Sequence, residues 1–264
     1  MTRIHIVGAS PRVGSTLLFE VLKTCYDLEC SPQHEESLVG RPSRPVDAYL
    51  SKYPLDALRV EPSIHVDHNL YIIFLIRDPR DVICSRHGKD KENYWVGLKY
   101  WNLFFPVYQR LRDHSRFVPL RYEKFVEEPD AVQESLEAVL PVGDRQHQFS
   151  NYHDHVQPST DSGDALGEVR PISGASVGRW KSHRPRVAGQ IELHRSISED
   201  LRTLGYEQNE EWTSILSGVD PCFGKTHYEE FATEEEISSL RKGRYRESAK
   251  RLLENLIGKR IPRQ

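Results

Sequence analysis

The chain opens on the stretch Ile4-His5-Ile6-Val7-Gly8-Ala9-Ser10-Pro11-Arg12-Val13-Gly14-Ser15-Thr16-Leu17-Leu18. Residues 4–8 are a short, largely β-branched run that ends at a glycine, which predicts a buried strand. A turn of Gly, Ser and Pro with one arginine follows. A helix is predicted from Gly14 to about Tyr26, because apolar residues recur there at helical spacing. Backbone N–H groups, two hydroxyls and one cation thus meet at a single point, which suits a phosphate.

Strands and helices alternate along the main part of the chain. Residues 71–76, Tyr-Ile-Ile-Phe-Leu-Ile, are continuously apolar, as expected for a strand covered on both faces. Another short strand is expected at 117–122, whereas 31–63 is predicted as a loop with short helical pieces and 150–175 as a mobile loop. Helices are expected from about residue 80 and over about 91–113, 130–140 and 187–204. This alternation predicts a largely parallel α/β sheet, whose ligands bind beyond the carboxyl ends of the strands.

The character of the chain changes beyond residue 210, so we expect a main domain over 1–210 and a helical extension over 211–264. Thr233-Glu234-Glu235-Glu236 fits a capping box. Gly243 is expected to split the extension into two helices, with an apolar face of Ile237, Leu240, Ala249, Leu252, Leu253 and Leu256. A docking helix, or a contact between the copies of a homo-oligomer, is the expected role.

Length and composition describe an ordinary globular protein of 264 residues, 38% hydrophobic and 28% charged. The formal net charge of −3 argues against general nucleic-acid binding. The sequence has neither an apolar run long enough to cross a bilayer nor a signal-peptide pattern, so the cytoplasm is the default location. Reduced thiols and no metal site are expected, because no Cys-x-x-Cys pair occurs among Cys25, Cys30, Cys84 and Cys222.

The opening loop is not a Walker A loop, which needs G-x-x-x-x-G-K-[ST]. Gly8 and Gly14 are one residue too far apart, and Gly14 stands where a lysine should precede Ser15. ATP binding in the usual P-loop manner is therefore disfavoured. The cation is instead Arg12, inside the loop, where its guanidinium would lie beside a bridging oxygen that gains charge as a leaving group departs.

A second phosphate-type motif follows the strand at 71–76. Arg77 leaves the sheet at its ligand edge, and Ser85 lies about two helical turns further on, so it can face back toward Arg77. An arginine and a hydroxyl together suit a phosphate clamp. Local pairing of Arg77 with Asp78 or Asp81 is the purely structural alternative.

A third motif is Ser173-Gly174-Ala175-Ser176-Val177-Gly178-Arg179-Trp180-Lys181. Its small residues let the backbone approach a ligand closely, and Arg179 and Lys181 add cations. Trp180 is expected either to anchor the loop or to stack on a base.

Together these motifs resemble the sulfotransferases that use 3′-phosphoadenosine 5′-phosphosulfate (PAPS), in particular their bacterial and Golgi-type branch. Pro11-Arg12-Val13-Gly14-Ser15-Thr16 resembles their 5′-phosphosulfate loop, and 77–85 resembles their 3′-phosphate motif. Three further stretches resemble later blocks of the family and occur in the same order: Arg121-Tyr122-Glu123 with Pro129, Ser176-Val177-Gly178-Arg179-Trp180, and Leu204-Gly205-Tyr206. The resemblance covers about residues 3–207. It implies a three-layer α/β fold with a parallel sheet of the P-loop nucleotide hydrolase type, flanked by helices.

The chain departs from the family pattern in three places. Val13 replaces the usual serine, and Lys124 replaces the usual aspartate after Arg-Tyr-Glu. Ser173-Gly174-Ala175 stand where the animal cytosolic enzymes have Arg-Lys-Gly. Arg170 is the residue that could substitute for that contact to the 3′-phosphate.

The resemblance implies a role for each motif. Arg12 would stabilise the leaving phosphate oxygen during in-line sulfuryl transfer, which needs positioning and charge neutralisation rather than a metal. Ser15, Thr16 and the loop amides would hold the 5′-phosphate, and Arg77 and Ser85 would hold the 3′-phosphate. The full set of expected cofactor-binding residues is Pro11, Arg12, Val13, Gly14, Ser15, Thr16, Arg77, Ser85, Ser176, Val177, Gly178, Arg179 and Trp180.

The acceptor needs a general base, for which the family uses a His or, in other branches, a Glu shortly after the first helix. His34-Glu35-Glu36 follows that helix here, and Glu36 resembles the base of the tyrosylprotein branch. The expected order of candidates is therefore Glu36, Glu35 and His34, ahead of His65 and His68. Exposed loop charges are the alternative reading of the two glutamates.

The expected activity is sulfuryl transfer from PAPS to a hydroxyl or an amine of a small-molecule, glycan or peptide acceptor. No metal, no nucleic-acid partner and no membrane span are expected. Two alternatives stay open, a nucleotide or small-molecule kinase on a related loop and a nucleotide-binding protein without turnover. Magnesium dependence with ATP would support the first. Tight binding of the bisphosphate product (PAP) without transfer would support the second.

Overall fold

A five-stranded parallel sheet forms the centre of the computed structural model, which describes residues 1–38, 40, 42, 46–87, 90 and 92–257. The strand order is β2-β3-β1-β4-β5. Their bounds are β1 (Thr2–Gly8), β2 (Glu29–Cys30), β3 (Ala48–Lys52), β4 (Leu70–Ile76) and β5 (Phe117–Arg121). The strands predicted at 4–8, 71–76 and 117–122 are confirmed, whereas β3 lies in a segment that the sequence predicts as a loop.

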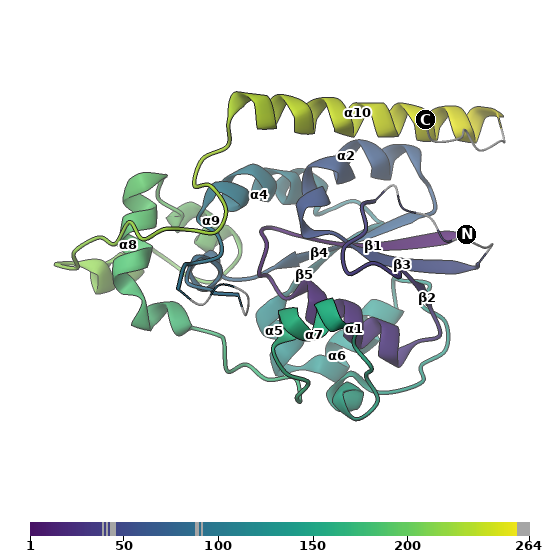
Figure 1. The fold of residues 1–264 in the computed structure, drawn as a ribbon, viewed down its shortest axis with the longest axis horizontal. Coiled ribbons are helices and arrows are strands. Elements are labelled where there is room, and N and C mark those ends of the chain that lie inside the picture. Colours follow the sequence, from purple (N-terminus) through teal and green to yellow (C-terminus); the bar gives the residue numbers. More distant parts are fainter. Residues whose placement is uncertain (39, 41, 43–45, 88–89, 91, 258–264) are drawn as a thin grey trace.

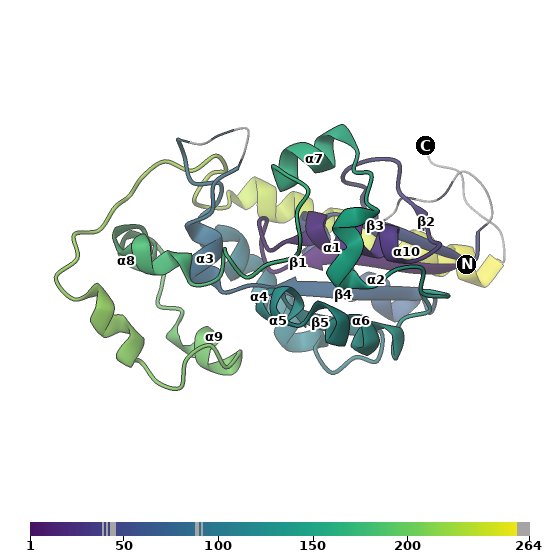
Figure 2. The same cartoon turned by 90° about the horizontal axis from the view of Figure 1, so that it is seen from below.

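Helices cover both faces of the sheet, which gives the three layers predicted for the fold (Figure 1). One face carries α2 (Ala57–Val66) and α4 (Lys99–Leu111), and α10 (Glu234–Ile257) packs along α2. The opposite face carries α1 (Ser15–Cys25), α5 (Tyr122–Glu127), α6 (Pro129–Glu137) and α7 (Thr160–Leu166). Figure 2 shows α3 (Pro79–Ile83), α8 (Arg184–Leu193) and α9 (Ser198–Thr203) beyond the carboxyl ends of the strands. Among the helices described, none is long and apolar enough to cross a bilayer.

The two central strands place the candidate site. Both β1 and β4 are covered on each face, and Ile6, Ile73 and Phe74 are fully buried in the core. Their parallel register pairs Gly8 with Leu75. The loop after β1 and the segment after β4 therefore leave the sheet side by side at its carboxyl edge, where ligands of such sheets bind.

Three predicted boundaries differ from the structure. The helix predicted over 91–113 begins only at Lys99, because Tyr94 instead forms a bridge with Thr226 of the C-terminal part. The helix predicted over 187–204 is two helices, α8 and α9, with a break at His194. The predicted mobile loop at 150–175 contains a 3₁₀ helix, Phe149–Asp154, and α7.

Two predictions for the C-terminal extension are wrong, the split into two helices and the apolar contact face. The helix α10 runs unbroken through Gly243, a residue that costs an α-helix only about 1 kcal/mol relative to alanine. Its contact face includes Ser248, which is buried with its Oγ 3.5 Å from Ser63 Oγ of α2, whereas Leu252 and Leu253 are exposed. The side chains of Leu240 and Leu256 lie outside the described part of the chain.

Candidate active site

The loop between β1 and α1 has an unusual backbone at the two residues that matter most. Arg12 has a φ of 70° and is the single non-glycine residue with a positive φ in the described part of the chain. Gly14, the residue before α1, has a φ of 98°. A Cβ at Gly14 would lie 2.5 Å from the ring of Tyr122, so the loop also needs glycine there for space. Two left-handed residues thus shape the backbone where the loop enters α1.

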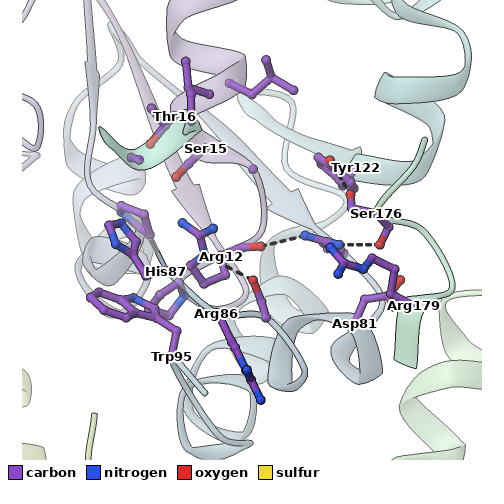
Figure 3. Close-up of a pocket in the computed structure, with 18 of the residues that line it drawn as sticks. Arg12, Ser15, Thr16, Asp81, Arg86, His87, Trp95, Tyr122, Ser176 and Arg179 are labelled. Carbon is purple, nitrogen blue, oxygen red and sulfur yellow. Dashed lines mark hydrogen bonds between the residues drawn. The ribbon is translucent and has the colours of Figure 1, made fainter. Parts of the chain in front are cut away.

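Arg12 reaches the second motif directly. Its Nε donates a hydrogen bond to Ser85 Oγ at 3.3 Å, and Figure 3 shows the guanidinium lying in the pocket. Burial, and secondly the nearby charge of Arg77, lowers the pKa of Arg12 to about 10. The side chain is therefore still a cation at neutral pH. Two residues that the sequence places in separate phosphate motifs thus meet in one place.

Arg77 ties two loops together. One terminal nitrogen donates to the carbonyl of Arg12 at 3.3 Å, and the other donates to the carbonyl of Ser176 at 2.7 Å. Its guanidinium also lies over the ring of Tyr122, with its central carbon 4.6 Å from the ring centroid, and Tyr122 in turn shares a hydrogen bond of 3.0 Å with Ser176 Oγ. The Nε of Arg77 is buried and has no partner among the described residues. Among the described residues, Arg77 donates to these two carbonyls instead of forming the predicted alternative, an ion pair with Asp78 or Asp81.

Asp81 fixes the third motif. Its two carboxylate oxygens accept hydrogen bonds from the backbone N–H of Gly178 at 2.7 Å and of Trp180 at 2.8 Å. Burial raises the pKa of Asp81. Trp180 is itself buried, with the guanidinium carbon of Arg80 at 4.1 Å from its ring centroid. Of the two roles predicted for Trp180, the structure therefore supports the loop anchor.

All three motifs open onto one cavity of about 670 Å³. The predicted cofactor-binding residues that line it are Pro11, Arg12, Gly14, Ser15, Thr16, Arg77, Ser85, Ser176 and Arg179. Arg170 lines the same cavity. The four that do not line it are Val13, Val177, Gly178 and Trp180. Val13 is fully buried against Gly8, where an added Cβ would lie 2.4 Å from Val13 Cγ2, so the departure from serine fills core space.

The three candidate bases differ in whether they line the cavity. His34 and Glu35 line the cavity, whereas Glu36 is not among its lining residues. The Glu36 carboxylate accepts a hydrogen bond from the Tyr49 hydroxyl, and its backbone N–H donates to the Lys52 carbonyl at 2.9 Å. The residue ranked first from the sequence is therefore held against β3 by these two hydrogen bonds, outside the lining of the cavity.

Lys52 is a site residue that the sequence analysis missed. Its Nζ lies 3.3 Å from His34 Nε2 and 3.6 Å from a carboxylate oxygen of Glu35, and the side chain is almost fully buried. Burial lowers the pKa of Lys52. The other ring nitrogen of His34, Nδ1, is 3.2 Å from Ser162 Oγ of α7. No local signal marks Lys52, because it lies at the end of a short strand inside a segment that is rich in Pro, Ser and charge.

The cavity thus combines a cationic end with an acidic wall. Helix amides, hydroxyls and arginines suit phosphate or sulfate groups, and Glu35 offers a carboxylate that can accept a proton. Within the described ranges, no three His, Cys, Asp or Glu side chains gather in a way that could hold a metal ion. The arrangement suits transfer of an anionic group between two bound molecules.

Comparison with known proteins gives a likeness of fold. Neither the protein-family models nor the curated proteins contain a match. Among solved structures the chain is similar to the sulfotransferase domain from the curacin biosynthetic pathway, at 16% identity, covering 69% of this chain and 91% of that one, with a TM-score of 0.43. It is also similar to the sulfotransferase domain of the Synechococcus PCC 7002 olefin synthase, at 16% identity, covering 69% of this chain and 88% of that one, with a TM-score of 0.46. A third similar structure is mouse sulfotransferase SULT7A1 complexed with PAP, at 14% identity, covering 82% of this chain and 88% of that one, with a TM-score of 0.45. These proteins are sulfotransferases, the family that the sequence motifs resemble, and at such identities the likeness concerns the fold alone.

Proposed function

We propose that the protein is a sulfotransferase that moves a sulfuryl group from PAPS to a hydroxyl or an amine of a small-molecule, glycan or peptide acceptor. The observation that carries the proposal is the hydrogen bond of 3.3 Å between Arg12 Nε and Ser85 Oγ. It brings the loop arginine and the serine of the second motif into one cavity. A donor with phosphates at both its 5′ and 3′ positions fits this double motif better than a nucleotide with a single phosphate chain.

The residues of the cavity divide the work of holding the donor. The amides of 14–16, with the hydroxyls of Ser15 and Thr16, bind the 5′-phosphate at the start of α1. Ser85 binds the 3′-phosphate, and Arg179 and Arg170, which line the same cavity, supply further positive charge. Arg77 adds its charge, but its fork mainly holds the two loops in register, since it bonds to the carbonyls of Arg12 and Ser176.

Transfer needs one base and one cation. Glu35 takes the proton of the acceptor hydroxyl as the acceptor oxygen bonds to sulfur, and Lys52 holds the Glu35 carboxylate in place at 3.6 Å. Arg12 neutralises the phosphate oxygen that keeps the electron pair when the bond to sulfur breaks. Glu35 replaces Glu36 as the first candidate for the base because it lines the cavity.

Calorimetric titration with PAP, with adenosine 5′-phosphate and with ATP plus magnesium tests the proposal. PAP should bind roughly 10- to 100-fold more tightly than adenosine 5′-phosphate, because a charge-assisted hydrogen bond contributes about 1.5–3 kcal/mol. The difference should shrink in Ser85→Ala. Tighter binding of ATP with magnesium than of PAP would contradict the proposal and favour a kinase. Tight PAP binding without any transfer from labelled PAPS would favour a protein that has lost turnover.

A further inference from the structure

The segment 221–231, here called the C-terminal strap, runs past α8 and then turns up to the start of α10 (Figure 1). Backbone hydrogen bonds hold it in three places. The N–H of Cys222 donates to the carbonyl of Pro185 at 2.8 Å, that of His227 to Tyr94 at 2.9 Å, and that of Tyr228 to Trp95 at 3.2 Å. The extension that lies outside the family resemblance is thus joined to the cavity wall.

Two glycines make room for the strap. A Cβ at Gly189, inside α8, would lie 2.3 Å from the backbone oxygen of Cys222, and a Cβ at Gly97 would lie 1.8 Å from a carboxylate oxygen of Glu230. Glu230 also forms an ion pair with Arg186 at 3.1 Å, and its other carboxylate oxygen lies 3.4 Å from His194 Nε2. A glycine inside a helix lowers the stability of that helix. Its presence at Gly189 therefore indicates that the sequence accommodates the close contact with the strap.

The strap completes an aromatic group at the cavity. Trp95 lines the cavity and stacks on His87, with ring centroids 4.3 Å apart, and on His227 of the strap at 3.9 Å. The adjacent strap residue, Tyr228, meets Trp95 edge to face at 5.6 Å. The two imidazoles occupy the faces of the indole, so Trp95 supports the wall rather than stacking on a ligand. Figure 3 shows Trp95 and His87 among the side chains that line the same pocket as Arg12.

Tyr228 is the strap residue that reaches the cavity itself, where it lines the same space as Glu35. Burial, and secondly the charge of Glu35, raises the pKa of the Tyr228 hydroxyl. The hydroxyl therefore stays protonated at neutral pH and can donate a hydrogen bond. The candidate base and a hydrogen-bond donor thus line the same cavity, close enough for the charge of Glu35 to act on the Tyr228 hydroxyl.

We infer that the C-terminal strap forms the acceptor-side wall of the site and that Tyr228 is the strap residue that contacts the acceptor and sets its specificity. This inference rests on the proposed sulfotransferase function. Tyr228 donates a hydrogen bond to the acceptor oxygen or nitrogen beside Glu35, and its ring limits the size of the group that enters. The extension is therefore part of the active site, and the domain over 1–210 is incomplete without it.

The experiment uses the full chain with ³⁵S-labelled PAPS and three probe acceptors: 4-nitrophenol, 1-hexanol and hexylamine. Release of labelled sulfate to water is read in the same assay, so a turnover is measurable even if no probe is accepted. The variants are Tyr228→Ala, Tyr228→Phe and Gly189→Ala, which displaces the strap from outside the cavity. Matched controls are Phe223→Ala, an exposed residue of the same strap, and Gly163→Ala, a helical glycine with open space around it.

Tyr228→Ala and Gly189→Ala should raise the KM of an accepted probe at least tenfold or, with water as acceptor, raise sulfate release at least fivefold. Tyr228→Phe should still limit the size of the group that enters the cavity, because it keeps the ring, but it should lose the hydrogen bond to the acceptor. The Kd for PAP should stay within twofold of the wild-type value in every variant, and both controls should behave as wild type. Unchanged acceptor KM values together with unchanged sulfate release would overturn the inference. Failure of the wild-type protein to bind PAP would instead refute the proposed function.

Discussion

At the scale of single residues, the site depends on an arginine in an unfavourable conformation. Arg12 lies at a φ of 70°, a region that costs an L-residue roughly 1–2 kcal/mol. Such strain persists where the surroundings enforce it, and here the Arg12 carbonyl accepts from Arg77 while its Nε donates to Ser85. Its guanidinium is thereby aimed into the cavity before any ligand binds.

Replacing Arg12 with alanine should reduce single-turnover transfer by roughly 10²- to 10³-fold, the effect typical of removing one preorganised electrostatic contact to a transition state. The midpoint of thermal unfolding should change little, because the backbone hydrogen bond from Arg77 is kept and only one side-chain hydrogen bond, to Ser85, is lost. Rapid-quench assays and a thermal melt measure the two quantities. Near-normal transfer by this variant would remove Arg12 from the mechanism.

The choice of base is tested by a matched pair of adjacent variants. Glu35→Gln should lower kcat by about 10²- to 10⁴-fold with little change in PAP affinity, as expected for loss of a general base. Glu36→Gln should retain most of the activity, because the Glu36 carboxylate bonds to Tyr49 outside the cavity. The reverse order of the two kcat values would return Glu36 to the first place that it holds from sequence.

At the scale of elements, the sequence predicts the strands that carry the phosphate motifs and misses the one that carries Lys52. Strands β1 and β4 are found because their apolar runs are local signals. In β3 the polar residues Ser51 and Lys52 are buried, and their partners come from elsewhere: Ser51 Oγ is 2.8 Å from His5 Nδ1, and Lys52 meets Glu35. A buried polar side chain whose partner lies far away in the sequence leaves no pattern along the chain. The ranking of Glu35 above Glu36 depends on contacts with the same strand, so it could not be predicted from the sequence either.

The close packing of the phosphate loop against α5 can be tested at Gly14. Gly14→Ala should weaken PAP binding at least tenfold and lower the thermal midpoint, because its Cβ would lie 2.5 Å from the Tyr122 ring in addition to the strain of a φ of 98°. Gly143→Ala is the matched control, since Gly143 has a φ of 78° but nothing within 4 Å. The control should show only a backbone cost of about 1 kcal/mol and unchanged PAP affinity. Equal effects of the two variants would argue against the contact.

At the scale of the whole molecule, one uninterrupted core supports both the cationic and the acidic side of the cavity. The central strand β1 contributes Ile6 to this core and also His5, which is completely buried next to Ser51 and Asp56. Burial lowers the pKa of His5 below its ordinary value of 6.5. The folded protein therefore holds this imidazole neutral while the unfolded chain can protonate it.

Stability should consequently depend on pH through His5. Because its pKa is lowered in the folded state, its contribution to the unfolding free energy is fully present above pH 6.5 and is lost as the pH falls through the folded pKa. Urea unfolding at pH 7.5, 6.0 and 5.0 should show a steeper decline for the wild type than for His5→Gln. The exposed His68 supplies the control, since His68→Gln should keep the wild-type slope. Identical slopes for all three proteins would exclude this role of His5.

The most direct measurement is a crystal structure of the full chain with PAP. We expect the 5′-phosphate on the amides of residues 14–16 beside Arg12, and the 3′-phosphate within hydrogen-bond distance of Ser85 Oγ. A nucleotide that binds outside the cavity, or that places only one of its phosphates on these two motifs, would contradict the central claim that both motifs grip a single bisphosphorylated adenosine.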